Sequence, residues 1–105
     1  MNKRLHLDFH DKPNLEVILH PRFIEWINSI SDRTVRNRLL FRIDKVKRGL
    51  IGDYKYLGCG LYELREFFGS GWRIYFVLIG NLSLLILHGG RKKAKKKILN
   101  IPLNY

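Results

Sequence analysis

The chain has 105 residues, enough for one domain with a modest hydrophobic core and too few for a second domain. Lysine and arginine number 20 against 9 acidic residues, a formal net charge of +11. The expected partners are therefore polyanions, with nucleic acid first and an acidic protein or an anionic membrane surface next. The single cysteine, Cys59, excludes an intrachain disulfide and a cysteine-rich zinc site, and favours a reducing compartment.

The N-terminus lacks the apolar core of a signal peptide. Positive charge comes early in MNKRLHLDFHDKP, but histidine, aspartate and lysine follow where a signal peptide is apolar. The most apolar stretch, residues 76–87, is too short to span a bilayer and is interrupted by a turn. We therefore expect a cytoplasmic chain with no membrane partner.

The first part of the chain favours an arm, a short strand and a helix. Residues 1–13 show no regular period and are expected to form a loose arm, and LEVIL after them is a short strand candidate. A helix is predicted for RFIEWINSI, because Phe23, Trp26 and Ile27 recur at helical spacing. Both bulky rings should then lie on one buried face.

A second helix is predicted for RTVRNRLLFRIDKVKRG. Ser31 or Asp32 can cap its N-terminus, and Gly49 can end it. Its predicted buried stripe consists of Val35, Leu39, Leu40, Ile43 and Val46. Its predicted outer face carries Arg33, Arg36, Arg42, Lys45 and Lys47. With a tight joint between them, the two helices should form a helical hairpin.

From Asp53 onward the period changes from helical to alternating. The segments YKYLGCG, LYELREFF, WRIYFVLI and LSLLILH are strand candidates, expected to pair as an antiparallel meander that ends at Gly89 and Gly90. A short basic helix or arm, RKKAKKKIL, follows. The predicted fold class is thus α+β, a helical hairpin packed on a twisted antiparallel sheet. The predicted core includes Phe23, Trp26, Ile27, Leu39, Ile43, Leu64, Ile74, Phe76 and Leu85.

The central hairpin gathers polar side chains. Alternation along its strands turns apolar residues such as Leu64 and Ile74 inward, together with the ring of Trp72. The residues that alternate with them are Glu63, Arg65, Arg73 and Tyr75. If the strands pair about the Gly-Ser-Gly turn, these four side chains share one sheet face, which we expect to be exposed.

The helical hairpin followed by GDYKYLGCGLYELR, GSGWRIYF and LHGGRKK, in this order, resembles the RelE/ParE superfamily of toxins from bacterial type II toxin–antitoxin systems. Within it, the chain is most similar to the phage-related, HigB-like "addiction module killer" branch. The likeness runs from Phe23 to Lys92, about two-thirds of the chain. The order and spacing of the motifs make it specific, since each short motif alone is weak. The chain departs from the family in having Arg91 where an aspartate is usual.

The resemblance implies cleavage of messenger RNA in the ribosomal decoding site, with a 2′-hydroxyl attacking the adjacent phosphate and no metal or other cofactor. It implies that Arg73 stabilises the transition state, and Arg65 is the second candidate. The alternative for each arginine is a salt bridge within the sheet, for Arg73 to Glu63. Because arginine does not deprotonate in proteins, the candidates for proton transfer are Glu63, Tyr75, His88 and Lys92.

Further cations are candidates for binding nucleic acid through its phosphates. They are Lys55, Arg91, Lys92, Lys93, Lys95 and Lys96. Tyr75 could in addition stack on a base. The histidines show no metal-ligand spacing, so no metal site is expected. The resemblance also implies, besides the ribosome and its message, a cognate antitoxin that is encoded next door and carries a helix-turn-helix domain.

Two other functions fit parts of the sequence. ParE-like members of the superfamily poison DNA gyrase, but the basic residues Arg73, Lys92 and Lys93 favour a ribonuclease. A non-catalytic basic module that binds nucleic acid, derived from a toxin, is the alternative from another class.

Overall fold

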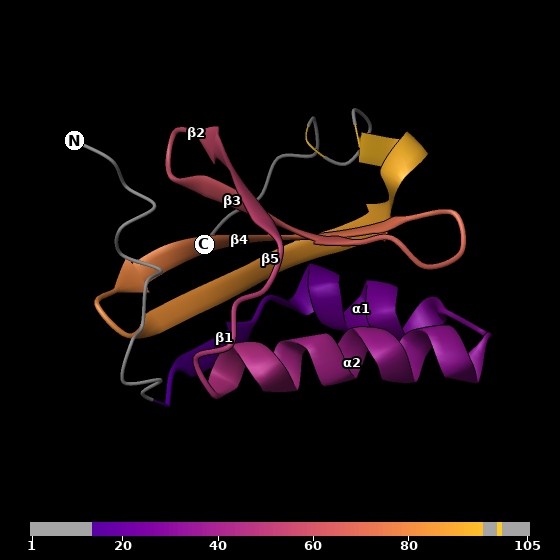
Figure 1. Ribbon diagram of the computed structural model, residues 1–105, viewed down its shortest axis with the longest axis horizontal. Helices are drawn as coiled ribbons and strands as arrows, with labels where there is room; N and C mark the ends of the chain where they lie inside the picture. Colours follow the sequence, from indigo (N-terminus) through magenta and orange to yellow (C-terminus); the bar gives the residue numbers. More distant parts are fainter. Residues whose placement is uncertain (1–13, 96–98, 100–105) are drawn as a thin grey trace.

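The computed structural model describes residues 14–95 and residue 99, so the predicted N-terminal arm and Lys96 lie outside the described residues. The elements in chain order are β1 (Glu16–Leu19), α1 (Pro21–Ser29), α2 (Arg33–Lys47), β2 (Tyr54–Gly58), β3 (Leu61–Glu66), β4 (Trp72–Gly80), β5 (Ser83–Arg91) and the 3-10 helix η2 (Lys92–Ala94). The two α-helices lie side by side under one face of the sheet (Figure 1). The α+β class and the helical hairpin are therefore confirmed.

The described sheet has five strands in the order β1-β5-β4-β3-β2. Strands β2 to β5 form the antiparallel meander that the alternation predicts. Strand β1, however, pairs with β5 in parallel, with Glu16 opposite Ser83, so the sheet is mixed rather than wholly antiparallel. The chain crosses beneath the sheet through α1 and α2 after β1, and such a crossover is what a parallel pair requires.

Glycine at position 89 serves the contact between helix and sheet. The prediction that β5 ends at Gly89 and Gly90 is wrong, because the strand continues to Arg91. A Cβ atom at Gly89 would lie 2.2 Å from Cζ3 of Trp26, so the absence of a side chain lets the indole of α1 approach the strand backbone.

Both helix starts are capped by side chains. The Nδ1 atom of His20 accepts a hydrogen bond from the backbone of Arg22 at 3.0 Å, with Pro21 in the first helical position of α1. Of the two predicted caps for α2, Asp32 is the one used, since its carboxylate accepts from Thr34 N at 2.9 Å. Gly49, with φ at +82°, follows the end of α2 as predicted.

The core lies between the helices and the sheet. Trp26 is partly buried against it, and the fully buried members of the predicted set are Phe23, Ile27, Leu39, Ile43, Leu64, Ile74 and Phe76. Leu85 is a wrong prediction, because its neighbours Leu84 and Ile86 are the buried core residues of β5. In a continuous apolar run, residue type does not reveal which residues face the helices. Leu40 is also wrong, since its side chain is 41% exposed.

Arg42 was expected on the outer face of α2, but its side chain is buried. Its Nη2 atom donates to the carbonyls of Ile51 at 2.8 Å and Asp53 at 2.6 Å. Its Nη1 atom donates to the carbonyl of Arg65 at 2.8 Å and to the carboxylate of Glu66. The arginine side chain is long, so a residue beside the apolar stripe of α2 can still place its guanidinium between the helix and the sheet. One guanidinium thus ties α2 to the loop before β2 and to the end of β3.

Replacing Arg42 by methionine, Arg42→Met, should lower the free energy of unfolding by about 3–5 kcal/mol. The change takes the donor from the carbonyls of Ile51 and Arg65 and the charged partner from Glu66, while the Asp53 carbonyl keeps only the backbone N–H of Arg65. Urea denaturation measures the change. The matched control is Arg48→Met, which removes an exposed ion pair with Asp44 and should cost less than about 1 kcal/mol. Equal losses in the two variants would contradict a structural role for Arg42.

Candidate functional site

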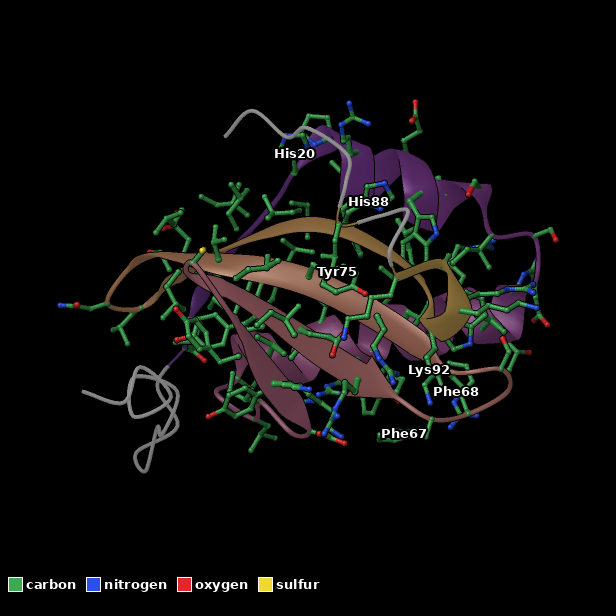
Figure 2. All side chains as sticks on the ribbon, turned by 90° about the horizontal axis from the view of Figure 1, so that it is seen from above. His20, Phe67, Phe68, Tyr75, His88 and Lys92 are labelled. Atoms are coloured by element: carbon green, nitrogen blue, oxygen red, sulfur yellow. The ribbon has the colours of Figure 1, made fainter. Side chains whose placement is uncertain are left out.

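The sheet face that points away from the helices carries most of the predicted catalytic residues (Figure 2). In the register of the sheet, Glu63 on β3 lies directly opposite Tyr75 on β4. Lys55 on β2 lies opposite Glu63, and His88 on β5 lies opposite Tyr75. Directly opposite residues of an antiparallel pair face the same side of the sheet. The four form one row across the sheet, and the predicted shared face is confirmed for Glu63 and Tyr75.

A second row of residues runs beside the first. Arg65 on β3 lies opposite Arg73 on β4, and Arg73 lies opposite Gly90 on β5. Asp53 holds the guanidinium of Arg65, whose Nε and Nη2 atoms donate to Oδ1 of Asp53 at 3.1 and 2.9 Å. The side chain of Arg65 is one-third exposed, so it faces solvent while its orientation is fixed.

The predicted stripe is not an exposed one, and this part of the prediction is wrong. Tyr75 and Glu63 are each 1% exposed, and Arg73 is 5% exposed. Residues after β5 approach this face: Lys92 N donates to the carbonyl of Gly71 at 3.1 Å, and Lys95 reaches Glu63. Burial also rules out Tyr75 as a base-stacking ring in this conformation.

Glu63 is the charged centre of the cluster. Its Oε2 atom lies 3.1 Å from Nζ of Lys95 and 3.6 Å from Nε of Arg73. The cross-strand ion pair that was the alternative for Arg73 is therefore present. The Nη1 atom of Arg73 also donates to the carbonyl of Trp72 at 3.0 Å. A buried carboxylate needs such partners, because an unpaired buried charge costs several kcal/mol.

The phenol of Tyr75 is protonated at neutral pH. Burial first, and then the negative charge of Glu63, raise the pKa of its phenol well above the ordinary value of 10.0, while Arg73 acts in the opposite direction. The hydroxyl therefore keeps its proton, which excludes Tyr75 as a general base at neutral pH. It can still donate a hydrogen bond or a proton.

His88 is held by its own strand. Its Nδ1 atom accepts a hydrogen bond from the backbone of Gly89 at 2.7 Å, and its ring centroid lies 6.5 Å from that of Trp26. One ring nitrogen of His88 is thus engaged by the backbone. Among the candidates for proton transfer, Glu63 is the one that lies beside both Arg73 and Tyr75.

The remaining predicted cations lie around the buried cluster. Those exposed to solvent are Lys55, Arg91, Lys92 and Lys93. Arg91 lies over the ring of Trp72, with its Cζ atom 5.5 Å from the ring centroid. Lys95 differs from them, because it is half-buried and paired with Glu63. Arg91 points to the helix side of the sheet, since it lies opposite the inward-facing Trp72 and lines a pocket with Trp26 and Asp32. The exposed lysines remain available to phosphates that approach the outer face.

Two residues of this region were missed by the sequence analysis. Asp53 orients Arg65, and Phe67 follows β3 with its ring close to both arginines: the Cζ atoms of Arg73 and Arg65 lie 5.5 and 5.9 Å from its centroid. The alternation of Glu63, Arg65 and Phe67 was the available signal for Phe67.

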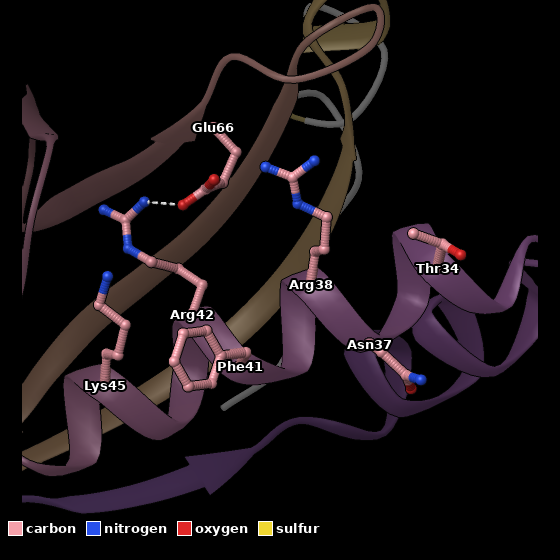
Figure 3. Close-up of a pocket in the computed structure, with 7 residues that line it drawn as sticks. All are labelled: Thr34, Asn37, Arg38, Phe41, Arg42, Lys45 and Glu66. Carbon is pink, nitrogen blue, oxygen red and sulfur yellow. Dashed lines mark hydrogen bonds and ion pairs between the residues drawn. The ribbon is translucent and has the colours of Figure 1, made fainter.

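A groove of about 560 Å³ separates α2 from the end of β3 (Figure 3). It is lined by Thr34, Asn37, Arg38, Phe41, Arg42, Lys45 and Glu66. Its charges serve the fold, since Arg42 and Glu66 are paired and the guanidinium of Arg38 lies 3.9 Å from the centroid of the Phe68 ring. The outer sheet face is therefore the better candidate for chemistry.

Residues 14–95 and 99 contain no group of three or more His, Cys, Asp or Glu side chains arranged for a metal ion. No helix within those residues combines the length and the apolarity needed to cross a membrane.

The variant Tyr75→Phe tests the environment of the phenol through the pH dependence of stability. Because the folded pKa is raised above the unfolded value of 10.0, this group's stabilising contribution is complete below pH 10 and is lost as the pH rises above it. Above pH 10, the free energy of unfolding of Tyr75→Phe should therefore fall less steeply with pH than that of the unchanged chain, by up to about 1.4 kcal/mol per pH unit.

Urea denaturation from neutral pH to about pH 11 measures this slope. Tyr56→Phe on edge strand β2 is the matched control and should keep a steeper slope than Tyr75→Phe. A Tyr75→Phe slope equal to that of the unchanged chain would contradict the raised pKa.

Comparison with known proteins agrees with this geometry at the level of the fold. No protein-family model matches the sequence. An uncharacterized protein from Haemophilus influenzae is 28% identical over 75 residues, which are 71% of this chain and 76% of that protein.

Solved structures of similar fold are toxins and toxin–antitoxin complexes. A double arginine-to-alanine mutant of E. coli toxin RelE in the free state superposes with a TM-score of 0.65 at 18% identity, over 82% of this chain and 92% of RelE. The toxin–antitoxin complex RelBE2 from Mycobacterium tuberculosis superposes with a TM-score of 0.58 at 14% identity, over 75% of this chain and 99% of the matched chain. The intact E. coli RelBE complex superposes with a TM-score of 0.58 at 18% identity, over 73% of this chain and 95% of the matched chain. The chain therefore has the fold of the RelE toxins.

Proposed function

We propose that the chain is the toxin of a type II toxin–antitoxin system, of the HigB-like branch, and that it cleaves messenger RNA on ribosomes in the cytoplasm. One observation carries the proposal: in a RelE-like fold, a carboxylate, a protonated phenol and two guanidiniums lie together on the outer side of the sheet, the first two buried in this conformation. These are Glu63, Tyr75, Arg65 and Arg73. The likeness of the motifs to the superfamily is an independent support.

In the proposed reaction, the 2′-oxygen of one nucleotide attacks the adjacent phosphorus, and the bond to the 5′-oxygen of the next nucleotide breaks. Glu63 accepts the proton of the 2′-hydroxyl, and Tyr75 supplies a proton to the leaving oxygen. Arg73 and Arg65 bind the phosphate oxygens on which negative charge grows. The products are a 2′,3′-cyclic phosphate and a 5′-hydroxyl. Glu63 becomes a base only once Lys95, now 3.1 Å from it, releases it.

Positive charge around the cluster supports an RNA substrate. The exposed lysines Lys55, Lys92 and Lys93 can neutralise phosphates on either side of the cleaved bond. Because the sites are cationic and the sequence carries a net charge of +11, affinity for RNA should fall as salt rises.

Two conservative variants test the assignment. Glu63→Gln keeps the shape of the side chain and removes the proton acceptor, and Arg73→Lys keeps the charge and removes the bidentate grip. Cleavage of a translated message should fall by roughly two to four orders of magnitude in Glu63→Gln. In Arg73→Lys, which keeps the charge, the cleavage rate should fall by no more than the roughly hundredfold to thousandfold loss caused by removing a pre-organised donor.

Arg73→Ala is a poorer test, because the burial of Arg73 makes truncation a change in stability as well. The exposed Lys47→Gln on α2 is the matched control and should cleave normally. Folding of each variant is checked by its urea midpoint. Cuts at fixed codon positions support the proposal, whereas broken DNA would identify a gyrase poison, and neither kind of cut would identify a binding module.

We also propose a cognate antitoxin encoded beside this chain, with a helix-turn-helix domain and an acidic segment that binds the basic surface. The solved complexes of similar fold support such a partner. Co-expression should restore growth and yield a complex that survives purification at moderate salt. Growth arrest that persists, with no complex recovered, would contradict this part of the proposal.

A further inference from the structure

Phe67 is an exposed aromatic ring beside the candidate site. It directly follows β3, and 63% of its surface is accessible. The Cζ atoms of Arg73 and Arg65 lie 5.5 and 5.9 Å from its ring centroid. A benzene ring offers a hydrogen-bonding ligand nothing, but it offers a planar ligand a stacking face.

The strand alternation places this ring on the outer sheet face. Glu63 and Arg65 point outward, and Glu66 points inward, where it pairs with Arg42 of α2. Phe67 is therefore the next outward residue. In Figure 2, which looks onto this face, Tyr75 lies near the middle and Phe67 lies at the rim.

The backbone under the ring is anchored by its neighbour. The ring of Phe68 packs against Trp72 with centroids 6.3 Å apart, and Arg38 covers it at 3.9 Å. The carbonyl of Phe68 accepts a hydrogen bond from Gly71 N at 3.0 Å, which closes the turn. An exposed ring on an anchored turn loses little conformational entropy when a ligand stacks on it.

Other exposed apolar residues lack this combination. Phe41 is similar in exposure at 58%, but it lies on α2 in the groove behind the sheet, with Nζ of Lys45 5.6 Å from its ring centroid. An acidic protein segment could bind the arginines, which are paired with Asp53 and Glu63 in the free chain, but it would leave the planar ring unused. Unpaired RNA satisfies both, because each nucleotide carries one phosphate and one flat base.

We propose that Phe67 is a stacking platform for one unpaired nucleobase of an RNA strand, next to a phosphate bound by Arg65 and Arg73. The inference rests on the proposed function and adds to it a base subsite at the tip of the β3–β4 hairpin. Because every base has a stacking face, this subsite grips the strand without selecting its sequence strongly.

The test measures binding of a fluorescein-labelled, unstructured RNA of about ten nucleotides to the intact chain. A set of otherwise identical RNAs lacks the base at one position each, so that ribose and phosphate remain. The variants are Phe67→Ala, Phe67→Leu and Phe67→Trp, and Phe41→Ala is the matched control of equal residue type and similar exposure.

Stacking predicts that Phe67→Ala binds about fivefold to 150-fold more weakly, that Phe67→Leu is equally weak, and that Phe41→Ala is unchanged. Removing the base at one position should weaken binding to the unchanged chain by a similar factor and should cost Phe67→Ala nothing further. Phe67→Trp should bind at least as tightly as the unchanged chain, with its added fluorescence quenched by RNA.

Three results would overturn the inference: equal binding by Phe67→Ala and Phe41→Ala, full rescue by Phe67→Leu, or no RNA binding by the unchanged chain. Loss of antitoxin binding in Phe67→Ala with RNA binding intact would also overturn it and would assign the ring to a protein interface. Cleavage of translated messages is assayed separately. Stacking without cleavage rejects the proposed function alone, and cleavage without stacking rejects this inference alone.

Discussion

One buried guanidinium fixes the end of β3 against the helices. Arg42 binds the carboxylate of Glu66 and the carbonyls of Arg65 and Asp53, so it fixes which residues at the end of β3 face the helices. Because side chains alternate along a strand, holding Glu66 inward sends Arg65 and Phe67 outward. A slip of one residue would exchange the two faces and place an arginine in the core. The helix thereby sets the geometry of the opposite sheet face at the end of β3.

The outer face shows why a polar cluster is tolerated inside a small domain. Glu63, buried between Arg73 and Lys95, has two cationic partners, and Tyr75 beside it keeps its proton. Apolar residues of similar size would often be as stable or more stable at such positions. Perturbed groups of this kind gather at functional sites, which is why the cluster supports the proposed site.

The sequence predicted what depends on local period and failed where distant segments meet. Alternation identified the four meander strands and the shared face of Glu63 and Tyr75, because register follows from two strands and one turn. It could not show that Lys95 returns to bury that face, nor that β1 joins β5 in parallel, since both are long-range contacts. In β5 the apolar run hides which residues face the core, and at position 89 a glycine that resembled a stop accommodates Trp26. Each failure is a tertiary contact that overrides a local signal.

Neighbouring residues of the hairpin divide structural and binding roles between them. Phe68 packs beneath Arg38 and against Trp72, whereas Phe67, one residue earlier, is open to solvent beside Arg73. The packed ring limits the motion of the exposed one, because a single peptide unit joins them. A ligand-binding surface built on such a strand end inherits its rigidity from the core, so changes at inward positions reach the outer face through the backbone. Stability and recognition are therefore coupled at this turn, and a substitution that loosens Phe68 should weaken whatever Phe67 binds.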